Sequence, residues 1–178
     1  EGHIPNTPVQ LLLYDALGFK RPEIGHVGHM TNPEGGKLSK RKGDGSIRDY
    51  REQGYLPEAL LNFMALLGWT PPGAEEGQEI LSVDELIAKF NIKDVTKAPS
   101  VFDRTKLNWM NGVYIRKRSV EELAELALPF VVKAGLATEE EIRNRWQWFV
   151  ELMQQIQPRV NTLAEVPDHV GYFFRDEI

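Results

Sequence analysis

The sequence predicts a mainly α-helical protein, because helix-start signals recur along the chain and strand signals are scarce. Four times a Ser or Thr is followed three residues later by Asp or Glu, a pattern in which hydroxyl and carboxylate satisfy free backbone N–H groups. The four positions are Ser46, Ser82, Ser119 and Thr138. Each predicts a helix that starts directly after it. Only residues 24–30 and 113–115 are typical of short extended segments, so we expect little sheet.

Three further helices are bracketed by Pro or Asp at the start and Gly at the end. They cover residues 8–18, 57–68 and 103–112. The first carries three consecutive leucines at 11–13, which predicts a helix buried in the core.

Apolar residues at helical spacing in the later helices are also expected in the core rather than in a site. They are Leu60, Leu61, Phe63, Met64, Leu66, Leu67, Trp109, Met110, Trp146, Phe149, Leu152, Met153 and Ile156. Stacking of Trp146, Trp148 and Phe149 on RNA bases is the alternative, and the regular spacing favours the core.

Length and composition bound the class of protein. The 178 residues suit one medium domain or two small ones, with boundaries expected at residues 70–79 or, preferably, 115–119. The chain has no Cys, which excludes thiolate catalysis, disulfides and Cys-type zinc sites and agrees with a reducing compartment. No run of about 18 apolar residues and no secretory signal occurs. We therefore expect a soluble, cytoplasmic protein without a membrane partner.

The charge distribution points to one basic segment. The net charge is −5, yet residues 37–51 alone sum to +4. Within residues 32–43, glycines flank Lys37, Ser39, Lys40, Arg41 and Lys42. Ammonium groups on such a loop can follow negative charge as it develops on a phosphate. A solvated basic turn is the alternative that the residues alone leave open. The segment is not a P-loop, because Leu38 follows Lys37.

The segment KLSKR at residues 37–41 resembles the KMSKS signature of class I aminoacyl-tRNA synthetases. Residues 1–18, 54–69 and 102–116, in this order, resemble the bacterial-type glutamyl-tRNA synthetases. No segment resembles the HIGH signature of that family, so we expect a fragment.

The resemblance implies three parts. Residues 1–35 would end a Rossmann-type nucleotide-binding catalytic domain, and residues 36–116 would form the stem-contact domain with the KLSKR loop. Residues 117–178 would begin a helical anticodon-binding domain. A severed catalytic domain would leave apolar surface uncovered around residues 11–17 and favour self-association.

The resemblance also implies an activity. ATP, with Mg²⁺, and L-glutamate would form glutamyl-adenylate, and the glutamyl group would pass to tRNA(Glu). The parent is expected to be a monomer. The fragment is expected to bind no cofactor and to be inactive alone. Two alternatives remain: the isolated chain is a tRNA-binding module without activity, or the parent is a non-discriminating enzyme that also charges the glutamine tRNA. The helices after Ser119 argue against the shortened paralogue and the β-barrel glutaminyl enzymes.

Site residues follow from the resemblance position by position. Lys37 and Lys40 would stabilise phosphate charge, with Ser39 shaping the loop and Leu38 beside the nucleotide. The remaining positions are Glu1 and His3 in the amino-acid and ATP pocket, His29 and Met30 at the adenine, and Arg41, Lys42 and Arg159 on tRNA, Arg159 at the anticodon. Arg116 begins a short basic run that can contact the tRNA backbone, and a solvated basic run is the alternative. No metal site is expected, because the pair His26 and His29 lacks a third ligand.

Overall fold

A computed structural model describes residues 2–36, 38, 46–73 and 78–174. The chain packs into two compact units. Unit 1 comprises Glu1–Ser39 and Met64–Asp103, and unit 2 comprises Lys40–Phe63 and Arg104–Ile178. Each unit brings together two stretches that are distant in the sequence. The three-part division implied by the resemblance stays a prediction.

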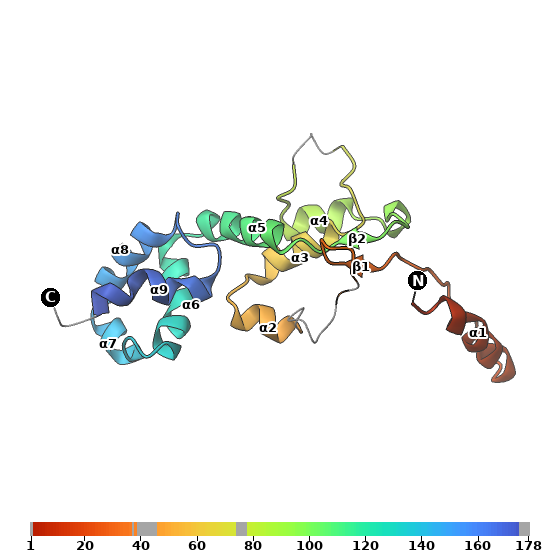
Figure 1. The fold of residues 1–178 in the computed structure, drawn as a ribbon, viewed down its shortest axis with the longest axis horizontal. Helices are drawn as coiled ribbons and strands as arrows, with labels where there is room; N and C mark the ends of the chain where they lie inside the picture. Colours follow the sequence, from red (N-terminus) through yellow and green to blue (C-terminus); the bar gives the residue numbers. More distant parts are fainter. Residues whose placement is uncertain (1, 37, 39–45, 74–77, 175–178) are drawn as a thin grey trace. The chain divides into compact units, whose positions relative to one another are not determined.

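Helices dominate the described residues (Figure 1). The α-helices are α1 (Thr7–Ala16), α2 (Ile47–Glu52), α3 (Pro57–Ala65), α4 (Val83–Lys89), α5 (Arg104–Lys117), α6 (Val120–Lys133), α7 (Glu139–Asn144), α8 (Trp146–Ile156) and α9 (Val166–Val170). Short 3₁₀ helices are η1 (Ile4–Asn6), η3 (Ile92–Asp94), η4 (Leu163–Glu165) and η5 (Gly171–Phe174). The strands are β1 (Met30–Thr31) and β2 (Ser100–Val101). The mainly helical prediction is confirmed.

The four predicted capping signals are all confirmed. Helices α2, α4, α6 and α7 start directly after the predicted Ser or Thr, and each has a complete capping box. In α6, for example, the Glu122 backbone N–H donates to the Ser119 hydroxyl oxygen at 3.2 Å. The Glu122 carboxylate in turn accepts from the Ser119 backbone N–H at 3.1 Å. Hydrogen bonds within one turn therefore stabilise each of these helix starts.

The sheet is a parallel pair of two-residue strands, with Met30 opposite Ser100. The Ser100 N–H donates to the His29 carbonyl oxygen at 3.1 Å. Just before β1, a Cβ atom at Gly28 would lie 2.5 Å from the Ala98 carbonyl oxygen, so only glycine allows this approach. The predicted extended segment at 24–30 thus becomes a strand only at its last residue.

The expected extended segment at 113–115 is wrong. Helix α5 continues through Gly112 to Lys117. Ile115 is fully buried, which shows that packing of the helix face outweighs the β-propensity of this segment. The glycine does not end the helix, and Gly112 lies in a tight contact described below.

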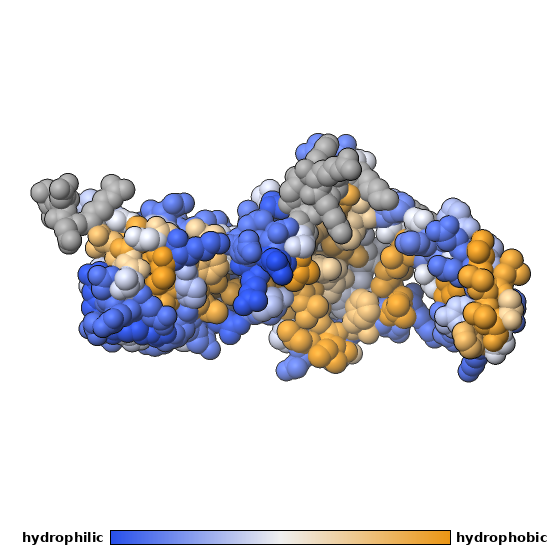
Figure 2. Space-filling model, turned by 90° about the horizontal axis from the view of Figure 1, so that it is seen from below, coloured by the Kyte–Doolittle hydropathy of each residue, from blue (hydrophilic) through white to orange (hydrophobic). Residues whose placement is uncertain are grey.

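Unit 1 has a small core and an uncovered first helix. Trp69, Leu81 and Leu86 form the core, and the Trp69 ring lies 5.3 Å from that of Phe90. The prediction that α1 is buried is wrong, because α1 buries none of its residues. Leu12 and Leu13 are 66% and 57% exposed. Apolar surface accordingly gathers over α1 in Figure 2.

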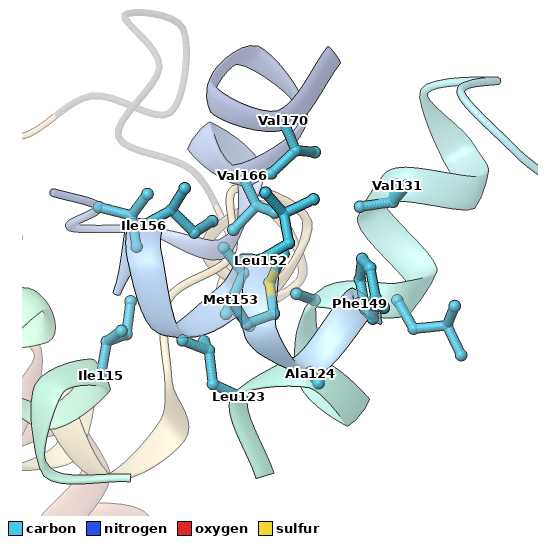
Figure 3. Packing of buried hydrophobic residues seen from close by; sticks show 14 of the residues in the cluster. Ile115, Leu123, Ala124, Val131, Phe149, Leu152, Met153, Ile156, Val166 and Val170 are labelled. Atoms are coloured by element: carbon cyan, nitrogen blue, oxygen red, sulfur yellow. The ribbon is translucent and has the colours of Figure 1, made fainter. Parts of the chain in front are cut away.

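Unit 2 holds the main core. Phe149, Leu152, Met153 and Ile156 of α8 are buried, as their spacing predicts, and Trp146 packs at the edge. Phe149, Leu152 and Met153 lie among residues of α6 and α9, as Figure 3 shows. Burying a side chain of this size contributes roughly 1.5–3 kcal/mol. The α6–α8–α9 packing therefore stabilises most of unit 2.

Three residues expected in the core are exposed. Leu61, Met64 and Trp109 are 48%, 44% and 46% exposed, whereas Leu60, Phe63 and Met110 are buried. Helices α3 and α5 bury one face, and the exposed residues lie on the other. In the part of the chain that the structure describes, no helix is both long and apolar enough to cross a membrane.

Candidate functional site

The first candidate region lies in unit 1, where the chain start meets the segment before β1. A Cβ atom at Gly2 would lie 3.2 Å from Cε1 of His29, so the backbone at residue 2 lies against this imidazole. The structure thus brings His29 close to the residue before His3, although 26 positions separate His3 and His29 in the sequence. His3 itself precedes η1 as its N-terminal cap.

His26 contacts the turn at His3 through the hydroxyl of Thr7. The Thr7 Oγ1 donates to the His3 carbonyl oxygen at 3.0 Å and lies 3.1 Å from Nε2 of His26. Because a hydroxyl has one hydrogen, His26 Nε2 is the donor when Thr7 donates to His3. His26 therefore acts as a hydrogen-bonding partner here. Among the described residues, no cluster of three His, Cys, Asp or Glu side chains could hold a metal ion.

In strand β1, the backbone groups of Met30 point away from the partner strand β2. The His29 carbonyl oxygen accepts from Ser100 of β2, and the Thr31 carbonyl oxygen accepts from Phe102, the residue after β2, at 2.8 Å. Alternate residues of a parallel strand direct their backbone groups to opposite sides, so the N–H and C=O of Met30 point away from β2. On that side the Met30 carbonyl oxygen accepts from the Leu38 N–H at 3.5 Å.

A compact turn brings Leu38 back to β1. The Gly36 N–H donates to Asn32 Oδ1 at 2.6 Å, and the Asn32 N–H donates to the Gly36 carbonyl oxygen at 2.7 Å. Gly35 has φ +83°, a conformation that suits glycine. The predicted site residues Glu1, Lys37, Ser39, Lys40, Arg41 and Lys42 lie outside the described residues. The structure therefore brings together His29, Met30 and Leu38 from the predicted nucleotide site.

A cavity of about 710 Å³ lies between α1 and residues 22–27, with His3, Thr7 and His26 among its lining residues. The end of α1 is fixed to the following loop by an ion pair, in which Arg21 Nε donates to Asp15 Oδ1 at 2.7 Å. This hydrogen bond from Arg21 holds the pKa of the Asp15 carboxyl below its usual value.

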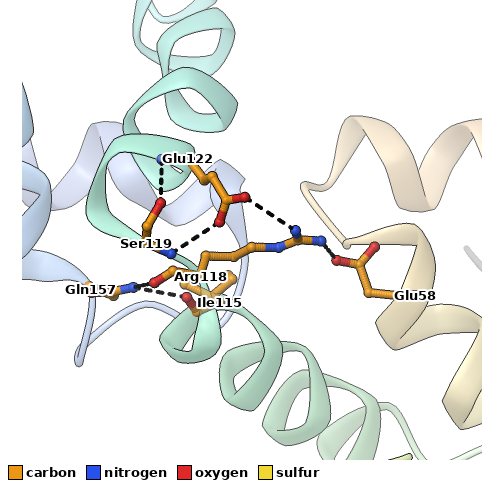
Figure 4. A network of polar contacts seen from close by, with 6 residues as sticks. All are labelled: Glu58, Ile115, Arg118, Ser119, Glu122 and Gln157. Atoms are coloured by element: carbon orange, nitrogen blue, oxygen red, sulfur yellow. Dashed lines mark hydrogen bonds and ion pairs between the residues drawn. The ribbon is translucent and has the colours of Figure 1, made fainter. Parts of the chain in front are cut away.

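The second candidate region lies in unit 2, where the turn after α8 meets the end of α5. Gln157 Nε2 donates to two backbone carbonyl oxygens, of Ile115 at 3.0 Å and of Arg118 at 2.9 Å. Figure 4 shows this amide pointing at both carbonyls. The turn carries the exposed Arg159.

Arg116 lies against the same turn. A Cβ atom at Gly112 would lie 2.3 Å from Asn161 Oδ1 and 2.9 Å from a guanidinium nitrogen of Arg116. Both side chains therefore lie against the backbone of Gly112, and a side chain at this position would displace their ends. The turn after α8 thus places Asn161, two residues beyond Arg159, close to Arg116. The predicted tRNA contacts Arg116 and Arg159 belong to neighbouring segments.

The junction between α5 and α6 is fixed by charges as well. Arg118 pairs with Glu58 of α3, and its second guanidinium nitrogen lies 4.0 Å from Glu122 of α6 (Figure 4). An ion pair of this partly exposed kind contributes up to about 1 kcal/mol. The pair fixes the C-terminal end of α5 relative to α3 within unit 2.

Two contributing residues were not found from the sequence. Gln157 precedes Pro158 and Arg159, and only the fold reveals the carbonyl groups that it contacts. The sequence suggests for His26 only a role as a metal ligand, whereas its imidazole contacts the Thr7 hydroxyl. A polar residue at a helix C-terminus is the one sequence signal that could have indicated Gln157.

Comparison with known proteins gives concordant matches. Residues 1–109 match the family model described as tRNA synthetases class I (E and Q), catalytic domain. The glutamate–tRNA ligase of Symbiobacterium thermophilum is 72% identical over 178 residues, which cover 100% of this chain and 37% of the relative. That of Aquifex aeolicus is 47% identical, covering 99% and 36%. The chain spans just over a third of the length of these curated relatives.

Solved structures agree. The crystal structure of glutamate-tRNA synthetase from Elizabethkingia anophelis aligns with a TM-score of 0.77 and 29% identity, covering 99% of this chain and 38% of that one. A glutamate tRNA ligase from Elizabethkingia meningosepticum, solved in complex with its amino acid, aligns with a TM-score of 0.76 and 30% identity, covering 99% and 37%. On this evidence the chain belongs to the class I tRNA synthetases for glutamate and glutamine, and residues 1–109 are part of their catalytic domain.

Proposed function

We propose that the chain is part of a glutamate–tRNA ligase, which condenses ATP and L-glutamate to glutamyl-adenylate and transfers the glutamyl group to tRNA(Glu). The observation that carries this proposal is the 72% identity with the glutamate–tRNA ligase of Symbiobacterium thermophilum along the entire chain. The parent works as a cytoplasmic monomer. Residues 1–35 end its nucleotide-binding domain, residues 36–116 form the stem-contact domain, and residues 117–178 begin the anticodon-binding domain.

The nucleotide end of the site is proposed around β1. The backbone of Met30, which points away from β2, reads the edge of the adenine, with His29 beside it. The hydrogen bond from Leu38 to Met30 supports this placement, because it joins one residue of the KLSKR segment to the same strand. Glu1 and His3 face the amino acid and the ATP.

Formation of glutamyl-adenylate requires electrostatic stabilisation of the phosphates and no protein nucleophile. A carboxylate oxygen of glutamate attacks the α-phosphorus of ATP, supplied with Mg²⁺, and pyrophosphate leaves. Lys40 and Lys37, on a loop shaped by Ser39, balance the negative charge that develops on the phosphates. Correct placement of the two substrates supplies the rest of the rate enhancement.

The tRNA end is proposed along Arg41, Lys42 and Arg116, which contact the backbone, and Arg159, which reads the anticodon. An Arg guanidinium can contact a base edge with two parallel hydrogen bonds. The exposure of Arg116 and Arg159 supports these roles. Arg159 also favours a discriminating enzyme over a non-discriminating one.

The test replaces Lys40 with Ala in the full-length parent. ATP–pyrophosphate exchange, measured with tRNA present, should fall by two or more orders of magnitude, roughly the effect of removing one group that stabilises the transition state. Affinity for tRNA should change little. Lys93→Ala is the matched control, because it removes the same charge from an exposed lysine on η3, outside the KLSKR segment. An unchanged exchange rate in Lys40→Ala would remove Lys40 from the mechanism.

A second candidate function applies to the isolated chain. The chain spans just over a third of the length of its relatives, and in this second case it is a tRNA-binding module that lacks activity on its own. Exchange assays and tRNA binding assays on the isolated chain separate the two cases. Binding without exchange supports the module, and exchange by the chain alone contradicts it.

A further inference from the structure

Gln157 occupies an unusual place at the end of α8. It is the C-terminal cap of this helix, and its half-buried carboxamide donates to the last turn of α5 and to the residue that follows α5. The acceptors are the carbonyl oxygens of Ile115 and Arg118, 3.0 and 2.9 Å away (Figure 4). The Ile115 carbonyl oxygen also accepts from the Arg118 N–H at 3.2 Å, so Gln157 adds a second donor there and joins the turn after α8 to the end of α5.

The chain beyond Gln157 is short and restrained. Pro158 fixes its own φ, and the Arg159 N–H donates to the Ile156 carbonyl oxygen at 2.8 Å. Val160 is fully buried in the unit 2 core. Arg159 is therefore an exposed side chain on a turn that is anchored on both sides, by Gln157 on α5 and by Val160 in the core.

We propose that Gln157 is a positioning residue, whose two hydrogen bonds to α5 set the direction in which Arg159 leaves the protein. This inference rests on the proposed reading of the anticodon by Arg159. Without the two bonds the turn keeps its anchor at Val160 but loses the one at α5. The guanidinium then spreads over several orientations, and recognition of one base edge weakens.

Substitutions at this position separate hydrogen bonding from shape. Gln157→Glu keeps the shape but turns an acceptor and a negative charge toward two carbonyl oxygens at a helix C-terminus, which is the least favourable arrangement. Gln157→Met keeps the size without a donor. Gln157→Lys restores a donor with favourable charge. Gln155→Glu makes the same charge change at an exposed position of the same helix turn and is the matched control.

The experiment uses the full-length parent. The kcat/KM for aminoacylation is measured on tRNA(Glu) and on the same tRNA with an altered anticodon base, and their ratio gives the discrimination. Arg159→Ala should lower discrimination more than any Gln157 variant does, while some discrimination from the rest of the anticodon contacts stays measurable. Gln157→Glu and Gln157→Met should lower it roughly tenfold, the scale of one or two net hydrogen bonds. Gln157→Lys and Gln155→Glu should stay within about threefold of the wild type.

A double variant identifies the route of the effect. If Gln157 acts through Arg159, Gln157→Glu combined with Arg159→Ala discriminates no worse than Arg159→Ala alone. Additive losses overturn the inference, and so does wild-type discrimination in Gln157→Glu and Gln157→Met while Arg159→Ala loses it. If Arg159→Ala discriminates normally, the proposed anticodon role fails and takes the inference with it. If Gln157→Glu does not fold, Gln157→Met is judged by the same criteria.

Discussion

The buried side chain of Asn111 donates to the backbone carbonyl oxygen of Asn161 at 2.5 Å, across 50 residues of sequence. Its oxygen accepts from the Leu56 N–H at 2.8 Å. One carboxamide of α5 thus joins the start of α3 to the turn after α8, and it satisfies a donor and an acceptor that lie in separate loops.

Asn111→Ala should destabilise the protein by about 2–4 kcal/mol, because a buried N–H and a partly buried C=O both lose their partner. Denaturant unfolding measures the loss. Asn144→Ala, at an exposed position in α7, is the control and should change the free energy of unfolding by less than about 0.5 kcal/mol. Equal effects of the two changes would show that Asn111 does not join the segments.

Gly54→Ala should destabilise unit 2 strongly. Gly54 has φ +80°, and an added Cβ atom would lie 2.5 Å from the Ala164 backbone nitrogen, which cannot move aside as a side chain can. The expected loss is roughly 2–4 kcal/mol, the sum of backbone strain and overlap.

Gly135→Ala is the matched control for Gly54→Ala. Gly135 has φ +71°, and nothing lies within 4 Å of the added atom. Only the backbone strain remains, so the loss in thermal unfolding experiments should be about 1 kcal/mol. The difference between the two variants measures the contact between Gly54 and the segment at 163–164.

The cap of α7 should make stability dependent on pH. The backbone N–H of Thr138, and next its hydroxyl, donate to the Glu141 carboxylate and hold the pKa of that carboxyl below its usual value of 4.5. A carboxyl with a lowered pKa in the folded state stabilises the protein at neutral pH, and this contribution disappears as the pH falls below 4.5 through the lower folded value.

Thermal unfolding between pH 7 and pH 3 tests the contribution of Glu141. Glu141→Gln should lower the unfolding temperature at pH 7 and reduce its decline toward acid. Glu140→Gln removes the same charge from the same turn without touching the cap on Thr138 and should leave the decline as in the wild type. Identical profiles for all three proteins would contradict the role of the cap.

Affinity of the chain for tRNA should fall as salt rises, because each phosphate contact releases counterions. Arg116→Ala should reduce the slope of log K against log[salt] by about 0.7–0.9. Arg143→Ala is the control, since Arg143 already pairs with Glu125 and Glu139. A slope that Arg116→Ala leaves unchanged would exclude Arg116 from the contact surface.

Local signals predicted much of the fold. The capping pairs at Ser46, Ser82, Ser119 and Thr138 act through hydrogen bonds within one turn, so the sequence alone was sufficient. The end of α5 was predicted wrongly at Gly112, because the helix continues through this glycine to Lys117 and buries Ile115 in the core.

The candidate site residues were predicted from the family resemblance and not from local sequence signals. His29, Met30 and Leu38 came from resemblance, and the structure adds that β1 and the turn at residues 32–36 bring them together. Gln157 and the pairing of His26 with Thr7 were not predicted, because both depend on contacts between segments that are far apart in the sequence.

The uncovered state of α1 has a consequence for its dynamics. This helix has 10 residues and buries none of them, whereas isolated helices shorter than about 12–15 residues are marginal in water. Its backbone amides should therefore exchange with deuterium almost as fast as those of an unfolded peptide, while the amides in the middle of α8, held by Phe149 and Met153, exchange only on opening of the unit 2 core. Helix α1 would thus acquire lasting protection only from surfaces that cover Leu12 and Leu13.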